Sequence, residues 1–210
     1  MGKVQITKKV LGICATNCYT VVDTETKEAL IIDPADRADV LIRDWKDKGV
    51  TPTTVLLTHG HFDHIGALAG VKKEYPDIKV YAAAEEKEVM ESPALNLSSS
   101  FGAAFTAQAD IYLEDGAEIE VLGRTCKCLL VPGHTKGGMC YYFPEEHVVF
   151  TGDTLFCYSV GRTDFPTGDA KALEDAIREK LFTLPDETLV LPGHDAQTMI
   201  GKEKKGNPYF

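Results

Sequence analysis

No apolar run in this sequence approaches the roughly 20 residues that a membrane-spanning helix needs. The first residues, MGKVQITKKV, also lack the apolar core of a secretory signal peptide. Basic residues are outnumbered, since 22 of them against 32 acidic ones give a net charge of −10. This balance argues against nucleic acid or an anionic membrane as the main partner. We therefore expect a cytoplasmic protein that acts on a small molecule; the sequence carries no signal for its oligomeric state.

Cysteine is scarce as well, and its six positions follow no disulfide framework. We interpret all six as reduced thiols of a cytoplasmic protein. Cys126 and Cys128 are separated by one residue, which is not the two-residue gap of common zinc or redox pairs. On a strand their side chains would share one face, so we expect them to be small buried residues.

The remaining composition is that of an ordinary globular protein, with 44% hydrophobic and 26% charged residues in a chain of 210. This length suits one domain with a sizeable core. No linker or low-complexity segment divides the sequence. We therefore expect residues 1–210 to form a single domain.

Strand-like and helix-like patterns alternate along the chain. Short β-type runs, such as VQITKKV, CYTVVD and EALIIDP, come first. Apolar residues at helical spacing then predict a helix over 38–49, and TTVLLT at 53–58 is typical of a buried strand. Helices are also predicted near 84–92 and over 169–182, the second with Asp169 as its N-cap.

This order of strands and helix occurs roughly twice. It favours an α/β fold of two similar halves, each a sheet with helices on its outer face, packed sheet to sheet. Residues 93–110 break the pattern, because they mix Ser, Ala, Gly and two Phe without a period. A loop of this length is commonly functional. We expect either a surface excursion or a flap over a site, with Phe101 as a candidate to contact substrate.

The most unusual stretch is T-H-G-H-F-D-H-I-G at 58–66, which holds three of the six histidines. A glycine turn after the predicted strand can point His59 and His61 to the same side. Asp63 and His64 then open the next helix. Two pairs of ligands offset in this way could serve two different ions, because imidazole and carboxylate are common metal ligands.

Three further candidate ligands lie far along the chain, each after a β-type run. His134 stands in V-P-G-H-T, His194 in L-P-G-H-D and Asp153 in F-T-G-D-T. A strand end is a position where a rigid sheet can hold a ligand in place. His147, in E-E-H-V-V-F, falls outside this pattern, and we expect a structural or surface role for it.

Taken in order, T-H-x-H-x-D-H, G-H-T, G-D-T and G-H resemble the motifs of the metallo-β-lactamase superfamily over nearly the whole chain. The resemblance implies an αββα sandwich of two mixed β-sheets flanked by helices, with a metal site at one edge of both sheets. It implies two divalent metal ions, for which we expect zinc, with iron or manganese as alternatives. The implied ligands are His59, His61 and His134 for one ion, Asp63, His64 and His194 for the other, and Asp153 as a bridge between both.

Two residues are expected to support these ligands from behind. Asp33, in I-I-D-P, matches a position that has this role in the family. Thr58 directly precedes the first histidine, and a metal-bound imidazole usually donates its other N–H to a nearby acceptor.

Within the superfamily, the chain is most similar to short glyoxalase II-like (hydroxyacylglutathione hydrolase-like) enzymes. The similarity lies in TGDTLFCYSVGRTDFPTG at 151–168 and in the final PGHDAQTMIGKEKKGNPYF. A bridging Asp153 is typical of this branch and absent from the β-lactamases themselves. The resemblance implies hydrolysis of a thioester, such as S-lactoylglutathione or a related acyl-thiol, by attack of a metal-bound hydroxide. Asp63 and Asp153 are the implied catalytic carboxylates.

The chain departs from full-length glyoxalase II at two points. It stops at Phe210, without the C-terminal helical domain that helps those enzymes hold glutathione. It also has Arg162 where the long enzymes carry lysine, and this guanidinium could grip a substrate carboxylate or form a structural salt bridge. Tyr158 is a further candidate to contact substrate and could equally belong to the core.

Other functions keep the same pattern. Persulfide dioxygenases share the histidines and a similar G-R-T-D-F segment, here at 161–165, but use a single iron held by residues that match His59, His134 and Asp153. Acyl-homoserine lactonases keep all seven ligands. A metal-binding module without catalytic activity is a further alternative, and it would hold its ions without an exchangeable water position.

Overall fold

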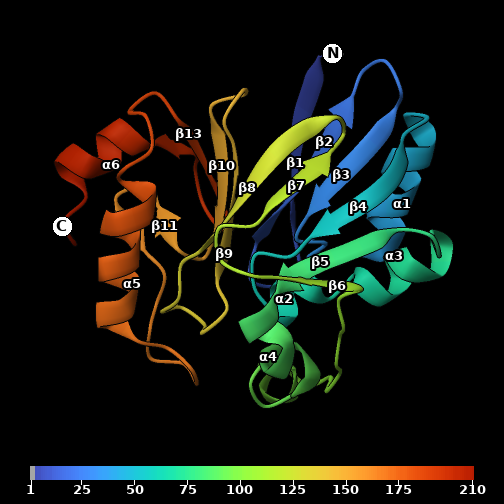
Figure 1. The fold of residues 1–210 in the computed structure, drawn as a ribbon. Coiled ribbons are helices and arrows are strands. Elements are labelled where there is room, and N and C mark those ends of the chain that lie inside the picture. Colours follow the sequence, from blue (N-terminus) through green and yellow to red (C-terminus); the bar gives the residue numbers. More distant parts are fainter. Residues whose placement is uncertain (1–2) are drawn as a thin grey trace.

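The computed structural model describes residues 3–210 and consists of two six-stranded sheets that face each other, with helices outside. Figure 1 shows the four layers: helices α1 (Ala38–Asp47) and α3 (Leu68–Glu74) cover the first sheet, and α5 (Ala170–Ala176) and α6 (Ile200–Gly206) lie outside the second. The αββα sandwich predicted from the sequence is therefore confirmed.

The first sheet is mixed. Its first three strands pair antiparallel, and its last four pair parallel. Parallel neighbours need a crossover connection, which α1, α2 (Phe62–Ile65) and α3 supply. Across the sheet its strands are β1 (Val4–Leu11), β2 (Thr16–Asp23), β3 (Glu28–Ile32), β4 (Thr51–Leu56), β5 (Lys79–Ala83) and β6 (Ile111–Leu113).

The second sheet is mixed as well. Only β10 and β13 pair parallel, and α5 with the π-helical turn Ile177–Leu181 connects them. Across the sheet its strands are β14 (Thr198–Met199), β13 (Leu189–Pro192), β10 (Val148–Gly152), β9 (Met139–Phe143), β8 (Arg124–Leu130) and β7 (Glu118–Val121). A small separate hairpin pairs β11 (Leu155–Phe156) with β12 (Ser159–Val160).

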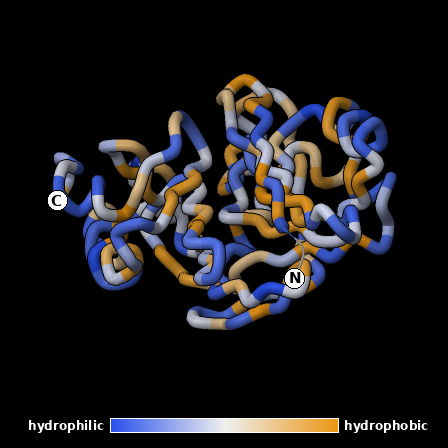
Figure 2. Tube along the Cα trace, turned by 90° about the horizontal axis from the view of Figure 1, so that it is seen from above, coloured by the Kyte–Doolittle hydropathy of each residue, from blue (hydrophilic) through white to orange (hydrophobic). Residues whose placement is uncertain are grey.

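Three apolar clusters hold these layers together. Between the sheets, Leu30 and Leu56 pack near Tyr141 and Phe150, all at most 1% exposed. The other two clusters lie between each sheet and its helices, and Trp45 on α1 is completely buried in one of them. Burying a large apolar side chain contributes about 1.5–3 kcal/mol. Seen from above in Figure 2, hydrophilic and hydrophobic stretches alternate along the outer turns, as expected of helices with one buried face.

The smaller predicted elements are present. The helix predicted near 84–92 is a 3₁₀ turn (Ala84–Glu86) that continues as α4 (Lys87–Glu91), and the loop that follows contains a second 3₁₀ turn (Ser98–Phe101). Asp169 caps α5, because its Oδ1 accepts a hydrogen bond of 2.9 Å from Ala172 N. Cys126 and Cys128 are fully buried, and all six cysteines are free thiols. Within residues 3–210, no helix is long and apolar enough to cross a membrane.

Candidate metal centre

The seven predicted ligands come together at one edge of the sandwich. There β4, β8, β10 and β13 end, and the segments that follow them carry the ligands. Their side chains form three overlapping groups of potential metal ligands, in which the ligand atoms lie within 4.8 Å of one another: His59, His61 and His134; His59, His64 and Asp153; and Asp63, His64 and His194.

The first of these, called the three-histidine group below, is deeply buried. His61 Nδ1 lies 3.1 Å from His59 Nε2 and 2.9 Å from His134 Nε2. The outer nitrogen of His134, Nδ1, donates to the carbonyl of Arg162 at 2.7 Å. Burial lowers the pKa of His59 well below its usual value, and that of His61 to about 3. These imidazoles are therefore neutral at pH 7, and their lone pairs converge on one point.

The group of Asp63, His64 and His194, called the mixed group below, contains a carboxylate. Asp63 Oδ2 lies 3.4 Å from His194 Nε2 and accepts a hydrogen bond of 2.7 Å from Thr16 Oγ1. Burial opposes protonation of His194, but hydrogen bonds to Asp153 and Asp63 raise its pKa to about 9. Burial likewise disfavours the charged form of Asp63, but the neighbouring His64 and His194 lower its pKa to about 2.

Asp153 lies between the two groups. Its Oδ1 is 3.3 Å from His64 Nε2, and its Oδ2 is 3.6 Å from His134 Nε2 and 3.2 Å from His194 Nε2. The backbone is closely packed here: a Cβ at Gly193 would come within 2.7 Å of His64 Cε1 and would also clash with the Asp153 carboxylate. Asp153 is therefore the one ligand placed to serve both groups.

The structure places Asp33 and Thr58 behind the imidazoles of His59 and His64. The Asp33 carboxylate is 1% exposed and accepts from Thr58 N at 2.8 Å, Thr58 Oγ1 at 2.6 Å and His64 Nδ1 at 2.9 Å. Because the Thr58 hydroxyl donates to Asp33, it can accept from His59 Nδ1, which lies 3.2 Å away. Both histidines thus direct Nε2 towards the centre, as metal-ligating histidines do.

One supporting residue was missed by the sequence analysis. Glu86 is fully buried behind the three-histidine group. Its Oε1 accepts from Gly60 N at 2.8 Å, and its Oε2 accepts from Thr135 Oγ1 and Gly137 N, both at 2.9 Å. Nothing in A-A-A-E-E-K-E-V distinguishes this glutamate from the half-buried Glu85 and the exposed Glu88, because only the tertiary structure buries it completely.

The donor set fits divalent metal ions. Asp153 Oδ1 is buried without a hydrogen-bond partner, which is costly for a polar atom in a folded protein. His59 Nε2 and His134 Nε2 both face His61 Nδ1, at 3.1 and 2.9 Å, and their outer nitrogens are used by Thr58 and by the Arg162 carbonyl. Zinc, iron and manganese all accept imidazole with carboxylate, so the donor set alone leaves all three metals as candidates.

The centre opens into a cavity of about 430 Å³. Phe101 lines it, is 51% exposed and stacks on Phe62 at a centroid distance of 4.3 Å. Arg162 lines it too, with its guanidinium 3.9 Å from the Phe165 ring centroid and 2.6 Å from Asp164 Oδ2. These two predicted substrate contacts therefore reach the cavity, and the structure also adds Cys14, Phe156 and Phe165 to its wall.

Tyr158 does not reach this cavity. It occupies the turn between β11 and β12 with φ of 55°, and it faces a separate surface hollow that Lys202 and Gly206 of α6 also line. The substrate contact predicted for Tyr158 is therefore not supported by the geometry. The turn directs its side chain towards α6, and sequence proximity to Asp153 could not reveal this.

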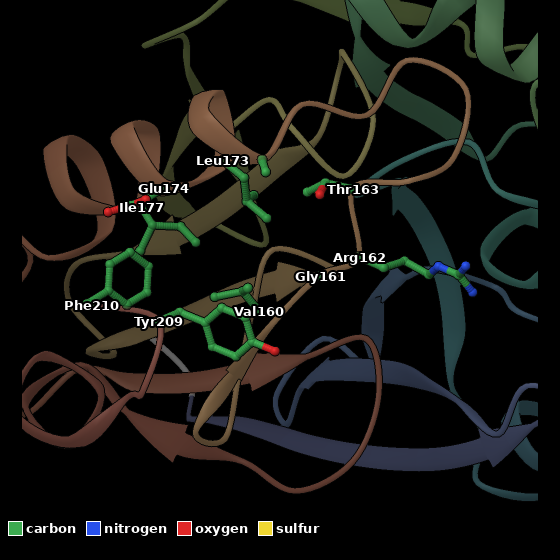
Figure 3. Close-up of a pocket in the computed structure, with 10 residues that line it drawn as sticks. Val160, Gly161, Arg162, Thr163, Leu173, Glu174, Ile177, Tyr209 and Phe210 are labelled. Carbon is green, nitrogen blue, oxygen red and sulfur yellow. The ribbon is translucent and has the colours of Figure 1, made fainter.

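A second cavity, of about 290 Å³, lies on the other side of segment 160–163. Figure 3 shows Leu173, Ile177, Tyr209 and Phe210 gathered around it, whereas the Arg162 side chain points away from it. The same segment thus forms one wall of each cavity, and the guanidinium belongs to the metal-centre side.

The metallo-β-lactamase superfamily model matches residues 11–194 of this chain. The chain belongs to this superfamily. Among curated members, a probable metallo-hydrolase YqgX of Bacillus subtilis is 38% identical over 202 residues, covering 95% of this chain and 94% of that protein. Hydroxyacylglutathione hydrolase GloC of Haemophilus influenzae is 35% identical over 200 residues, covering 92% of each. Membership of this metallo-hydrolase superfamily supports an enzyme.

Solved structures of the superfamily agree with the fold. The B3 metallo-β-lactamase BLEG-1 has a TM-score of 0.92 and 39% identity, over 98% of this chain and 99% of its own. TTHA1623 in a di-iron-bound form has a TM-score of 0.85 and 35% identity, over 97% and 100%. ETHE1 from Myxococcus xanthus has a TM-score of 0.82 and 31% identity, over 97% of this chain and 83% of its own.

Proposed function

We propose that this protein is a thioester hydrolase that uses two divalent metal ions and acts on S-lactoylglutathione or a related acyl-thiol. The position of Asp153, within 3.2–3.6 Å of histidines from both ligand groups, carries the binuclear part of the proposal. The match to hydroxyacylglutathione hydrolase GloC supports the substrate class. The net charge of −10 supports a small-molecule substrate rather than nucleic acid.

His59, His61 and His134 would hold one ion, Asp63, His64 and His194 the other, and Asp153 would contact both. Two ions bound there would lower the pKa of water and polarise the carbonyl of the substrate. We expect zinc in this role, and the di-iron form of TTHA1623 makes iron the main alternative.

The residues of the chain complete the reaction site. Asp63 lines the cavity and is held by Thr16, so its carboxylate is placed to take the proton that the attacking water releases. The leaving thiol has an ordinary pKa near 8.5, so it departs as thiolate with little need for a general acid. Arg162, at the mouth of the cavity, is available for a carboxylate on the thiol part of the substrate.

The test is the rate at which zinc-loaded protein removes the thioester absorbance of S-lactoylglutathione. We expect rapid hydrolysis that is lost in Asp153→Asn. Absence of turnover with two ions bound would reject glutathione thioesters as the substrate class. Iron-loaded protein that consumes oxygen with a persulfide would instead favour a dioxygenase.

Hydrolysis of β-lactams is a second candidate function, because BLEG-1 is a B3 metallo-β-lactamase with 39% identity and a TM-score of 0.92. The same zinc-loaded preparation should be assayed on a chromogenic cephalosporin. A catalytic efficiency there above that for the thioester would replace the first proposal.

A further inference from the structure

Glu86 is a charged residue with no exposed surface and no role in the chemistry described above. It stands at the end of the 3₁₀ turn after β5, on the first half of the molecule. It accepts three hydrogen bonds, all from donors on other segments: Gly60 N, Thr135 Oγ1 and Gly137 N. A buried carboxylate that accepts from three separate donors fixes their relative positions.

These donors directly adjoin the three-histidine group. Gly60 lies between His59 and His61, and Thr135 follows His134. Oε1 therefore holds the segment that carries two ligands, and Oε2 holds the loop that carries the third, which follows β8 of the second half. The side chain of Glu86 thus connects the two loops that carry His59, His61 and His134.

The backbone at Gly60 and Gly137 lies close to the Glu86 side chain. A Cβ at Gly60 would lie 2.7 Å from Met90 Cγ and 3.3 Å from Glu86 Oε1, and a Cβ at Gly137 would lie 2.5 Å from Oε2. A side chain at Gly137 would collide with Glu86 itself and one at Gly60 with Met90, so the close approach of both loops depends on these two glycines.

Asp33 supplies a contrast on the other side of the centre. Its carboxylate holds His64 of the mixed group and, through Thr58, His59. The donors to Glu86 lie beside His59, His61 and His134, and none of them belongs to His64 or His194.

We propose that Glu86 is a positioning residue that sets the affinity of the ion held by His59, His61 and His134, by keeping the two ligand-bearing loops in register. This inference rests on the binuclear centre proposed above. It adds that Glu86 supports only one of the two groups, whereas Asp33 supports a histidine of each.

The variant Glu86→Gln tests it, because the amide keeps the shape but replaces one acceptor oxygen with a donor. Removing a supporting partner of a metal ligand typically lowers metal affinity 10–100-fold. We expect a loss of this size for one ion, measured by competition with a chelator during zinc loading of metal-free protein. The affinity for the other ion should change less than about threefold.

Two reference backgrounds identify the ion. His194→Ala removes a ligand of the mixed group, and His61→Ala removes one of the three-histidine group. Glu86→Gln should weaken the ion that remains in His194→Ala and leave the ion that remains in His61→Ala unchanged. An equal loss in both backgrounds, or no loss in either, would overturn the proposal.

Glu203→Gln is the matched control. Glu203 is also fully buried and accepts from Thr198, Tyr158 N and Asn207, but it lies on α6 away from the ligands. We expect this variant to lower thermal stability without changing the affinity for either ion. A loss of ion affinity equal to that in Glu86→Gln would show a general effect of instability and overturn the proposal. Thr135→Val removes one donor only, so a smaller loss for the same ion is expected even if Glu86→Gln folds poorly.

The readouts separate this inference from the proposed function. If the chain binds two ions but hydrolyses no thioester, the substrate proposal fails and the selective ion loss in Glu86→Gln still stands. If hydrolysis is present but Glu86→Gln binds both ions with unchanged affinity, the positioning role fails alone.

Discussion

The three-histidine group lies inside the protein, where the side chain of His134 is only 5% exposed, whereas the side chain of His194 in the mixed group is 21% exposed. Burial lowers the pKa values in the first group, so its lone pairs are free at neutral pH. In the mixed group the acidic partners raise the pKa of His194 to about 9, so metal must displace a proton there. The comparison teaches that two ions in the proposed centre would not be bound alike, and it predicts unequal affinities for them.

Removing the ligand shared by both groups should give the largest effect. Asp153→Asn takes away one negative charge within 3.2–3.6 Å of three histidines. We expect hydrolysis to be abolished. The affinity for at least one ion should fall by more than the roughly 10–100-fold loss that is typical when a supporting residue is removed. Metal analysis after dialysis, together with the thioester assay, measures both. Full activity in this variant would show that Asp153 does not bridge the groups.

The pH dependence of the unfolding free energy should report on Glu86, the carboxylate behind the three-histidine group. Burial raises the pKa of Glu86 from 4.5 to about 7, against the hydrogen bonds that favour the charged form. A raised folded-state pKa means that stability is fully present below pH 4.5 and is lost as pH rises through about 7. The difference in unfolding free energy between metal-free wild type and Glu86→Gln should shift by up to about 3 kcal/mol over this window. A difference that stays constant from pH 4.5 to 8 would contradict the shift.

Asp33→Asn should weaken the mixed group, which Glu86→Gln leaves unchanged, because Asp33 holds His64 directly as well as His59 through Thr58. In the wild type, His64 Nδ1 and Thr58 donate to the two oxygens of the Asp33 carboxylate. Asp33→Asn leaves only one acceptor oxygen for these donors. We expect a 10–100-fold loss of ion affinity in the His61→Ala background, where only the mixed group binds. Asp36→Asn, an exposed neighbour, is the control. Unchanged affinity in that background would remove the contrast between the two supporting carboxylates.

The smallest effect is expected at the mouth of the cavity. Arg162→Gln should raise the KM for S-lactoylglutathione by about fivefold with little change in kcat, because exposed ion pairs contribute little. Arg178→Gln is a matched control, since that guanidinium also lies over a phenylalanine ring, at 4.8 Å, and beside Glu174, but not in the metal cavity. Equal KM values for both variants would exclude Arg162 as a substrate contact.

The candidate ligands could be predicted from the sequence, because their motifs occur in a characteristic order and spacing and because they follow β-type runs. His134 and His194 each come directly after Pro-Gly at a strand end, and the sheets bring these ends to one edge. The αββα arrangement followed from the repeated order of strands and helix. Asp33 and Thr58 were predicted from the family position and from the need of a bound imidazole for an acceptor.

The remainder depends on tertiary structure. Glu86 belongs to an acidic run with the half-buried Glu85 and the exposed Glu88, so only the docking of the loop after His134 makes it different. Tyr158 and Phe156 are two residues apart in one short hairpin, yet Phe156 lines the metal cavity and Tyr158 turns to α6. Tyr158 has a left-handed φ in this turn, and the periodicity of the sequence does not predict such a backbone conformation.

Each ion site draws on both halves of the chain, since His134 completes one group and His194 the other. His64 and His194 are 130 residues apart in sequence. During synthesis on the ribosome, the cluster at 59–64 therefore emerges long before its last partner exists. Neither half can form a complete site alone, so metal loading would wait for the finished chain. Ions bound there would then stabilise only the assembled protein.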